Sequence, residues 1–384
     1  MATLPTPTTP LSSLLSLRDF ELSAEATLKP KSWAYYSSVA DDGQTAQQGL
    51  DVWEDIRFRP RVLRDVGGDV DLQTTIAGCK SRVPFMISPA AMGKLAHKDG
   101  ELCLVQGAAR TGMIYCPSNH ASVSQRDLAA AALPSQTLFF QLYVHRERWR
   151  SEKQLAEAKA LGYKAVVVTV DVPVAGNREL DLRTGLDANA VELANPGMEV
   201  GQKALAVAET VATIDASLTW EDLAWVKKAS GGLPLFVKGI HGYEDAVLAH
   251  QYGAAGIYLS NHGGRQVDTA PTPLEILLEL HHYAPHLLYN PSFPVILDGT
   301  VRRGTDVVKA LCLGATAVSL GRPFMYSLIY GTDGVERVAR ILEDEVGRCL
   351  RLLGCKSVKE LMPAMVNAKR VERRIWGEGS KLRR

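Results

Sequence analysis

The sequence lacks the features that mark most specialised classes of protein. Its 384 residues carry 43 Lys+Arg against 42 Asp+Glu, a net charge of +1, so no charge excess favours nucleic acid or a membrane surface as a partner. No apolar run is long enough to cross a bilayer. The six cysteines include no C-x-x-C pair and no His partner at zinc-site spacing. We therefore expect no metal site and reduced, mostly buried thiols.

Clear targeting signals are also missing from the two ends of the chain. Residues 1–17 are rich in Pro, Thr, Ser and Leu but lack the basic start of a secretory signal. We expect a disordered extension there, followed by a single domain of residues 18–384. Residues 380–382 read Ser-Lys-Leu, a peroxisomal signal when C-terminal, but Arg383 and Arg384 follow them. We therefore expect a cytoplasmic protein.

Short apolar segments alternate with segments of helical pattern along most of the chain. This alternation predicts parallel strands joined by right-handed crossovers, and eight such units predict a closed (β/α)8 TIM barrel. An open doubly wound sheet is the alternative, although the Gly-rich first turn typical of that fold is absent. The predicted strands are residues 85–88, 113–116, 138–142, 165–170, 235–238, 256–260, 295–298 and 317–320. The predicted helices include residues 100–111, 152–161, 220–229, 244–252, 273–283 and 305–313.

Three segments fall outside this repeat. Residues 18–75, with Trp33, Tyr35 and Tyr36, predict a helical cap before the first strand. Residues 178–218, after the fourth strand, are too long for an ordinary crossover and predict an active-site lid. The basic tail from about Val335 has a helical pattern and is expected to pack outside the barrel.

The sixth predicted strand ends in the most informative motif of the chain. It runs into His262, Gly263, Gly264 and Arg265. An imidazole and a guanidinium side by side at a strand end could take a proton and hold a carboxylate. The alternative is a Gly-rich turn with a hydrogen-bonded histidine and a surface arginine.

Polar residues stand at the other strand ends too, where the chemistry of barrel enzymes is located. The loops after the last two strands carry glycines and arginines, which favour a phosphate-bearing ligand over solvated rim arginines. Lys, Asp, His, Arg and Tyr side chains converging on one rim favour an enzyme. Each could otherwise be an ordinary turn, core or surface residue. The residues at these strand ends and in these loops are Ser118, His120, Gln141, Tyr143, Thr169, Asp171, Arg178, Lys238, Asp298, Gly299, Arg302, Gly321 and Arg322.

Several motifs together resemble one enzyme family. Residues 260–266 (SNHGGRQ), 139–143 (FFQLY), 169–171 (TVD), 301–306 (VRRGTD) and 58–66 (FRPRVLRDV) are similar to those of the FMN-dependent 2-hydroxy acid oxidases and dehydrogenases. The resemblance covers roughly residues 19–362 in order. It implies a TIM-barrel enzyme with bound FMN that oxidises the CH–OH group of an (S)-2-hydroxy acid to a 2-oxo acid.

The resemblance also implies a role for each matching residue. His262 would be the base and Asp171 its carboxylate partner, with Tyr143 near the substrate hydroxyl and Lys238 by the flavin N1/O2 edge. The substrate-binding residues would be Tyr35, His120, Tyr143, Arg178 and Arg265. The cofactor-binding residues would be Pro89, Ala90, Ala91, Ser118, Gln141, Thr169, Lys238, Ser260, Asp298, Gly299, Arg302, Gly321 and Arg322.

The chain departs from the family pattern at three positions. His120 stands where the family has an aromatic residue, usually Trp, and Val39 and Thr300 stand where it has Gly. Because His120 is polar, the pocket could admit a larger or more polar substrate than glycolate or lactate. Two alternatives stay open: the same chemistry on a cyclic amino acid or imine that bears a carboxylate, and a catalytically silent barrel that binds a phosphate ligand.

The electron acceptor and the assembly are expectations as well. No haem-binding segment precedes the predicted barrel, which favours oxygen or another soluble acceptor. The resemblance suggests a homotetramer without nucleic-acid or membrane partners.

Overall fold

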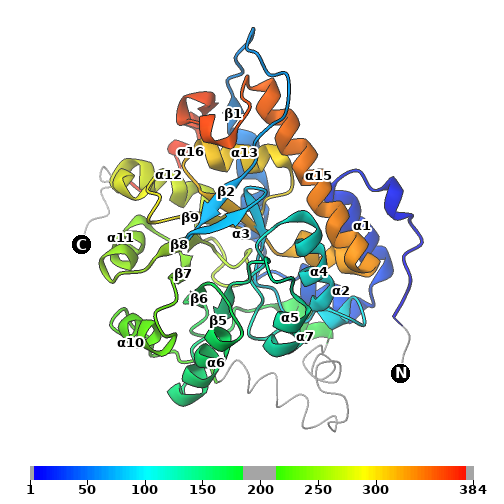
Figure 1. Ribbon diagram of the computed structural model, residues 1–384, viewed down its shortest axis with the longest axis vertical. Coiled ribbons are helices and arrows are strands. Elements are labelled where there is room, and N and C mark those ends of the chain that lie inside the picture. The colour runs from blue at the N-terminus through cyan, green and yellow to red at the C-terminus, as the bar shows by residue number, and fades with distance from the viewer. Residues whose placement is uncertain (1–3, 185–212, 378–384) are drawn as a thin grey trace.

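Seven parallel strands form one curled sheet at the centre of the protein (Figure 1). The computed structural model describes residues 4–184 and 213–377, so most of the predicted lid and the Ser-Lys-Leu segment lie outside the described residues. In spatial order the strands are β4 (Phe85–Ile87), β10 (Ala317–Leu320), β9 (Val295–Asp298), β8 (Gly256–Leu259), β7 (Leu235–Ile240), β6 (Val166–Thr169) and β5 (Phe140–Leu142). Each matches a predicted strand, and the predicted parallel α/β arrangement is confirmed.

The predicted second strand, residues 113–116, is not a strand in the structure. Tyr115 instead makes one isolated parallel bridge to Ile87 of β4 and one to Leu138 beside β5. Backbone hydrogen bonds accompany both, from Cys116 N to Ile87 O at 3.1 Å and from Phe139 N to Tyr115 O at 3.0 Å. The segment therefore touches both edges of the sheet, but each ladder is one residue long and does not count as a strand.

The six predicted crossover helices are present and surround the sheet. They are α4 (Glu101–Thr111), α6 (Arg148–Ala160), α10 (Asp222–Ala229), α11 (Tyr243–Gln251), α12 (Pro273–Tyr283) and α13 (Gly304–Cys312). Figure 1 shows α6, α10, α11 and α12 following one another around the outside of β5 to β9. The start of α12 is set locally, because Thr272 and Glu275 form a capping box and Pro273 takes the first helical position. Shorter helices α5 (Gln125–Ala131) and α14 (Arg322–Ser327) were not predicted.

Both faces of the central strands are buried, which explains their continuous apolar sequences. Alternate residues face inward and form a separate cluster that includes Met86, Phe139, Val167, Phe236 and Tyr258. Their neighbours along each strand join the larger core under the helices. Period-two alternation thus fills the inside of the curled sheet with side chains. This packed floor leaves the carboxyl ends of the strands as the place for a ligand.

The N-terminal region contains helices α1 (Leu17–Thr27), α2 (Pro30–Ser37) and α3 (Gln44–Asp51). It also contains strand β1 (Arg57–Phe58), which pairs with β11 (Val366–Asn367), and the hairpin β2 (Thr74–Ile76) and β3 (Cys79–Ser81). Helix α1 contacts α14, and α2 contacts α7 (Glu179–Thr184).

Part of the segment expected to be disordered makes defined contacts. Leu14 is 2% exposed, and its carbonyl accepts hydrogen bonds from Arg337 on α15 (Gly331–Leu352). The carbonyl of Thr9 accepts one from the Tyr330 hydroxyl. Burial of Leu14 supplies an ordering force that composition alone does not reveal. The division of the chain at residue 17 stays a prediction.

The C-terminal helix α15 packs outside the sheet against α4 and α13, as expected for the tail. Its apolar residues Val335, Val338, Leu342 and Val346 recur at helical spacing and are buried. The six cysteines are free thiols, five of them buried, which confirms that expectation. None of the described helices combines the length and the apolar character needed to cross a membrane.

Two glycines of α15 allow a paired test of packing. A Cβ at Gly334 would collide with the Ser327 carbonyl oxygen and lie 2.7 Å from the Tyr330 Cβ, whereas a Cβ at Gly347 would meet nothing within 4 Å. We expect Gly334→Ala to lower the free energy of unfolding by about 1–3 kcal/mol. Gly347→Ala should raise it by about 0.5–1 kcal/mol, because alanine is the better helix former. Urea unfolding followed by circular dichroism measures both, and shifts of the same sign would contradict the packing described.

Candidate active site

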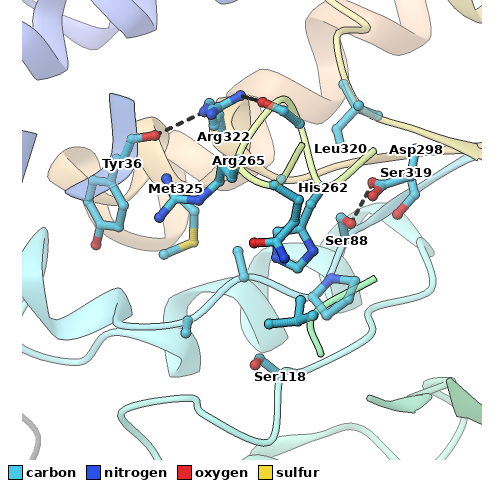
Figure 2. A pocket seen from close by; sticks show the side chains of 18 of the residues that line it. Tyr36, Ser88, Ser118, His262, Arg265, Asp298, Ser319, Leu320, Arg322 and Met325 are labelled. Atoms are coloured by element: carbon cyan, nitrogen blue, oxygen red, sulfur yellow. Dashed lines mark hydrogen bonds between the residues drawn. The ribbon is translucent and has the colours of Figure 1, made fainter. Parts of the chain in front are cut away.

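A cavity of about 300 Å³ opens at the carboxyl ends of the strands. Most residues that the sequence predicted for the site line it, and Figure 2 places His262 between Arg322 on one side and Ser118 on the other. The predicted residues that line the cavity are Tyr35, Pro89, Ala90, Ala91, Ser118, His120, Tyr143, Arg178, Lys238, His262, Arg265, Asp298, Gly299, Arg302, Gly321 and Arg322. Asp171, Gln141, Thr169 and Ser260 do not line it, but each hydrogen-bonds to a residue of the predicted set.

A tight turn after β8 presents His262 to the cavity. His262 has a φ of 56°, and its N–H donates to Ser260 Oγ at 3.2 Å. Gly263 and Gly264 also have positive φ values, of 66° and 74°. A Cβ at Gly264 would lie 2.8 Å from the backbone nitrogen of Ala46, so only glycine fits there. The left-handed backbone at His262 is strained, and such strain is typical of functional sites.

Asp171, at the end of β6, fixes the orientation of the His262 ring. Its Oδ1 lies 2.9 Å from His262 Nδ1, and the Asp171 side chain is fully buried. Burial alone would raise the pKa of Asp171, but its interaction with His262, which includes a hydrogen bond, and the charge of Lys238 lower it below its ordinary value. The carboxylate is therefore ionised, and Nδ1 carries the proton that it accepts. Burial lowers the pKa of His262, so its ring is neutral and Nε2 is free to take a proton.

Two arginines and a carboxylate line the same cavity as His262. Arg265 Nη1 donates to the carbonyl of Tyr35 at 2.7 Å, and the guanidinium lies 5.2 Å from the centre of the Tyr35 ring. Asp181 Oδ2 lies 3.4 Å from Arg178 Nη1 and 3.9 Å from Arg265 Nη2. Burial and the charge of Arg178 lower the pKa of Arg265 to about 10. Two partly buried cations at one point of a cavity form a place for an anion.

A buried ion pair forms part of the cavity wall. Lys238 Nζ, at β7, is 3.0 Å from Asp298 Oδ2 at the end of β9, and their side chains are 4% and 8% exposed. Ser260 Oγ accepts from Lys238 Nζ at 3.0 Å and donates to Asp298 Oδ2 at 2.8 Å. Ser88 Oγ donates to Asp298 Oδ1 at 2.7 Å (Figure 2). These bonds hold the ammonium group at one position on the cavity wall.

The far rim carries a partly buried arginine that bonds to backbone carbonyls. Arg322 donates to the carbonyls of Tyr36, Gly263 and Ser38 at 2.8–2.9 Å, two of which Figure 2 draws. Burial lowers the pKa of Arg322, since neutral acceptors compensate its charge only in part. Ser319 also lines the cavity, next to Asp298 in Figure 2, and its buried Oγ has no hydrogen-bond partner among the described residues. The cavity therefore offers a cation at this rim and an unsatisfied hydroxyl on β10 to polar ligand groups.

His120 forms part of the wall next to the catalytic histidine candidate. Its ring stacks on Tyr143 with centroids 4.9 Å apart, and the Tyr143 hydroxyl lies 3.4 Å from His262 Nε2. Burial lowers the pKa of His120 to about 4, so the ring is neutral. A neutral imidazole offers one donor and one acceptor.

Some residues of the site were missed by sequence reasoning. Asp181 follows Arg178 by three residues on α7, a spacing that could have pointed to it. Ser88 directly follows β4, and Ser319 is the penultimate residue of β10. A small serine side chain is not distinctive enough for either residue to be predicted from the sequence. The other cavity-lining residues that were not predicted include Met92, Val172, Ala175, Ile214, Gln266 and Met325.

One group of potential metal ligands lies outside this cavity. Atoms of His97, Asp99 and Cys103 approach within 4.8 Å of one another. His97 Nδ1 already accepts from the Asp99 N–H at 3.2 Å, and Lys98 pairs with the Asp99 carboxylate. Cys103 Sγ lies 3.3 Å from the same His97 nitrogen.

Comparisons with known proteins point to one family. A family model described as FMN-dependent dehydrogenase matches residues 24–368. The mouse (Mus musculus) 2-hydroxyacid oxidase 2 is 39% identical over 361 residues, which cover 94% of this chain and 100% of the relative. Glycolate oxidase of Spinacia oleracea is 37% identical over 370 residues, covering 92% and 96%. L-lactate dehydrogenase (cytochrome) of Wickerhamomyces anomalus is 38% identical over 366 residues, but the match spans only 63% of that protein.

Solved structures agree with these relatives. The recombinant flavin-binding domain of baker's yeast flavocytochrome b2 superposes with a TM-score of 0.86 at 37% identity, covering 97% of this chain and 91% of that one. A mandelate oxidase variant with (S)-mandelic acid superposes with a TM-score of 0.79 at 32% identity, covering 92% and 98%.

The Lys238–Asp298 pair yields a stability test. Lys238→Met would leave the Asp298 carboxylate buried without its cation, and we expect a loss of about 3–5 kcal/mol in the free energy of unfolding. Adding Asp298→Asn should recover part of that loss, because the orphaned charge disappears. Urea unfolding measures both. The exposed pair of Lys359 and Asp71 serves as control, and Lys359→Met should cost at most about 1 kcal/mol. A double variant less stable than Lys238→Met would contradict this account.

Proposed function

Because the chain belongs to the family of FMN-dependent dehydrogenases, we propose that it oxidises a 2-hydroxy acid to a 2-oxo acid. The observation that carries this proposal is the 2.9 Å His262–Asp171 contact in the cavity that Arg178 and Arg265 also line. A base and an anion-binding pair are thereby placed to act on one small molecule that carries a hydroxyl and a carboxylate.

The residues of the cavity fit FMN. Ser319 Oγ is a buried hydroxyl without a partner among the described residues, and Arg322 needs an anion beyond its carbonyl acceptors. A Cβ at Gly321 would meet only the Ser88 Cβ at 3.8 Å, so the backbone there is open to a ligand. We propose that the phosphate is held by Gly299, Arg302, Gly321 and Arg322, the ribityl chain by Asp298, and the flavin ring by Pro89, Ala90, Ala91, Ser118, Gln141, Thr169 and Ser260.

His262 serves as the base in this proposal. Its neutral Nε2 takes a proton from the substrate, and the resulting imidazolium is stabilised by the Asp171 carboxylate at Nδ1. FMN, when bound, supplies the acceptor for the two electrons that the substrate loses. Lys238 places a fixed positive charge beside it, where negative charge grows on reduction.

The substrate is oriented by its carboxylate and its hydroxyl. Arg265 and Arg178 bind the carboxylate, and Tyr35 adds a hydroxyl to the same group. Asp181 lies within 4 Å of both guanidinium groups, and its negative charge reduces the repulsion between them. Tyr143, 3.4 Å from His262 Nε2, hydrogen-bonds near the reacting hydroxyl.

His120 sets the size and polarity of the substrate side chain. As a neutral ring it contacts apolar groups by its face and hydrogen-bonds to polar ones by its edge. The named relatives act on glycolate, lactate or other 2-hydroxy acids, and this favours a hydroxy acid over a cyclic amino acid or imine. We infer a 2-hydroxy acid with a side chain larger or more polar than that of glycolate.

The finer features of fold and assembly are part of the proposal. The bridges of Tyr115 to both sheet edges support a closed (β/α)8 barrel. We propose that helices α1 to α3 form its N-terminal cap and that residues 18–384 make up a single domain. We further propose oxygen as the acceptor, a homotetramer, and a cytoplasmic location.

Purified protein should be yellow and release FMN on denaturation. Under anaerobic conditions, glycolate, (S)-lactate or (S)-mandelate should bleach the flavin, while proline and pipecolate should not. Visible absorption spectra measure both. Colourless protein that fails to take up FMN would favour the silent barrel, and bleaching by the amino acids alone would overturn the hydroxy acid.

The pH dependence of kcat/KM should report the His262 base. Because burial lowers the pKa of His262, kcat/KM should stay high at neutral pH and fall only below a midpoint under about 6.5. Asp171→Asn removes a charge that raises this pKa, so the midpoint should move lower and the plateau should fall on the order of 10²–10⁴-fold.

Two variants complete that test. His262→Ala should keep FMN but lose substrate reduction, whereas His282→Ala, at an exposed position on α12, should leave the rate unchanged. An acidic midpoint that rises in Asp171→Asn would refute the assigned pairing.

A further inference from the structure

Two of the loops that line the cavity meet at one buried carboxylate outside it. The loop after β4 contributes residues 89–92 to the cavity wall, and the loop after Cys116 contributes Ser118 and His120. Glu101, the first residue of α4, lies between these loops and is 0% exposed. It does not line the cavity, and the proposed chemistry does not use it.

The carboxylate of Glu101 bonds to both loops at once. Oε1 accepts from the Gly93 N–H at 2.7 Å and from the Ser122 N–H at 2.9 Å. Oε2 accepts from Ser122 Oγ at 2.7 Å. Ser122 Oγ in turn accepts from the Lys94 N–H at 2.9 Å. A hydrogen-bond network through Glu101 therefore joins Gly93 and Lys94, which follow Met92, to Ser122, which lies two residues after His120.

The loop after β4 is built for this close approach. A Cβ at Gly93 would lie 2.9 Å from both Glu101 Cδ and the Glu101 nitrogen, so glycine is required there. Met92 has a φ of 66°, a left-handed conformation that costs free energy in a non-glycine residue. Its carbonyl accepts from the Tyr36 hydroxyl at 2.7 Å. Tyr36 and Glu101 thus hold the strained turn from two sides.

Burying a carboxylate costs desolvation free energy, which a link between two loops does not by itself require. Its charge is compensated by three hydrogen-bond donors and by the N-terminal end of α4, where a negative charge is favoured. Charge-assisted bonds are short and directional, which suits a group that must fix geometry.

We propose that Glu101 is a positioning residue, which sets the spacing between the flavin-facing residues 89–92 and the His120 wall of the substrate pocket. This inference rests on the proposed function, because the spacing matters for a substrate held between flavin and His120. Misplacement of reacting groups by about 1 Å can cost on the order of a hundredfold in rate.

The test compares three variants of the full-length, FMN-loaded protein. Glu101→Ala removes both links, and Glu101→Gln keeps an acceptor for the two N–H groups and a donor for Ser122 Oγ. Glu275→Ala is the matched control, because Glu275 also accepts a backbone N–H and a hydroxyl at a helix N-terminus, from Thr272 at 2.7 and 2.9 Å, but does not line the cavity. Thermal stability, the flavin spectrum, kcat and KM are measured with glycolate and (S)-lactate.

Glu101→Ala should lower kcat/KM on the order of ten- to hundredfold with a shifted flavin spectrum, and Glu101→Gln should recover most of the loss. Glu275→Ala should be less stable but unchanged in kcat/KM. If Glu101→Ala does not fold, Ser122→Ala is measured in its place, and its kcat/KM is expected to fall about three- to tenfold. Equal kcat/KM in the Glu101 or Ser122 variants and in Glu275→Ala would overturn the positioning role.

Failure of the proposed function has a different signature. In that case no 2-hydroxy acid bleaches the flavin of the wild-type protein. The flavin spectrum and the FMN dissociation constant still report the spacing of the loops. A change in both for Glu101→Ala but not for Glu275→Ala supports the positioning role, and no change in either contradicts it.

Discussion

The hydrogen bond between His262 Nδ1 and Asp171 Oδ1 is the contact on which the rest of the site depends. An imidazole that gains a proton in a buried cavity needs a fixed negative charge, because burial otherwise opposes the charged form. Asp171 comes from β6 and His262 from the turn after β8, so the bond also requires that the strands keep their relative positions. The packed interior of the curled sheet, with Phe236 and Tyr258 beneath, supplies that rigidity.

Around this bond the protein places more positive than negative charge. Lys238 is matched by Asp298 and Arg178 by Asp181, whereas Arg322 bonds to carbonyls, and Arg265 reaches Asp181 only at 3.9 Å. Partly buried cations with incomplete compensation cost stability unless an anion binds beside them. The substrate carboxylate and the FMN phosphate carry the two negative groups that would complete them. Binding of both should therefore stabilise the fold as well as prepare the reaction.

Much of this was predictable because the strands are short apolar runs that end in polar residues. Seven predicted strands, six predicted crossover helices and the position of His262 beside Arg265 follow from that pattern. The segment at Tyr115 was predicted as a strand because it is equally apolar, yet it pairs through only one residue on each side. Apolar composition reports burial and not the length of a hydrogen-bond ladder. Leu14 shows the converse, because it is buried and its segment makes defined hydrogen bonds although the composition there suggests disorder.

Glu101 shows which kind of residue a sequence pattern cannot identify. Its partners are two backbone N–H groups and one serine hydroxyl, and backbone donors carry no residue identity that a pattern could record. Sequence reasoning found the residues that face a ligand because their side chains are chemically distinctive at strand ends. Residues that hold those strand ends in place act through the backbone, so they become visible only when the loops are seen together. Glu101 is therefore the kind of residue that a structure adds to a site otherwise readable from its motifs.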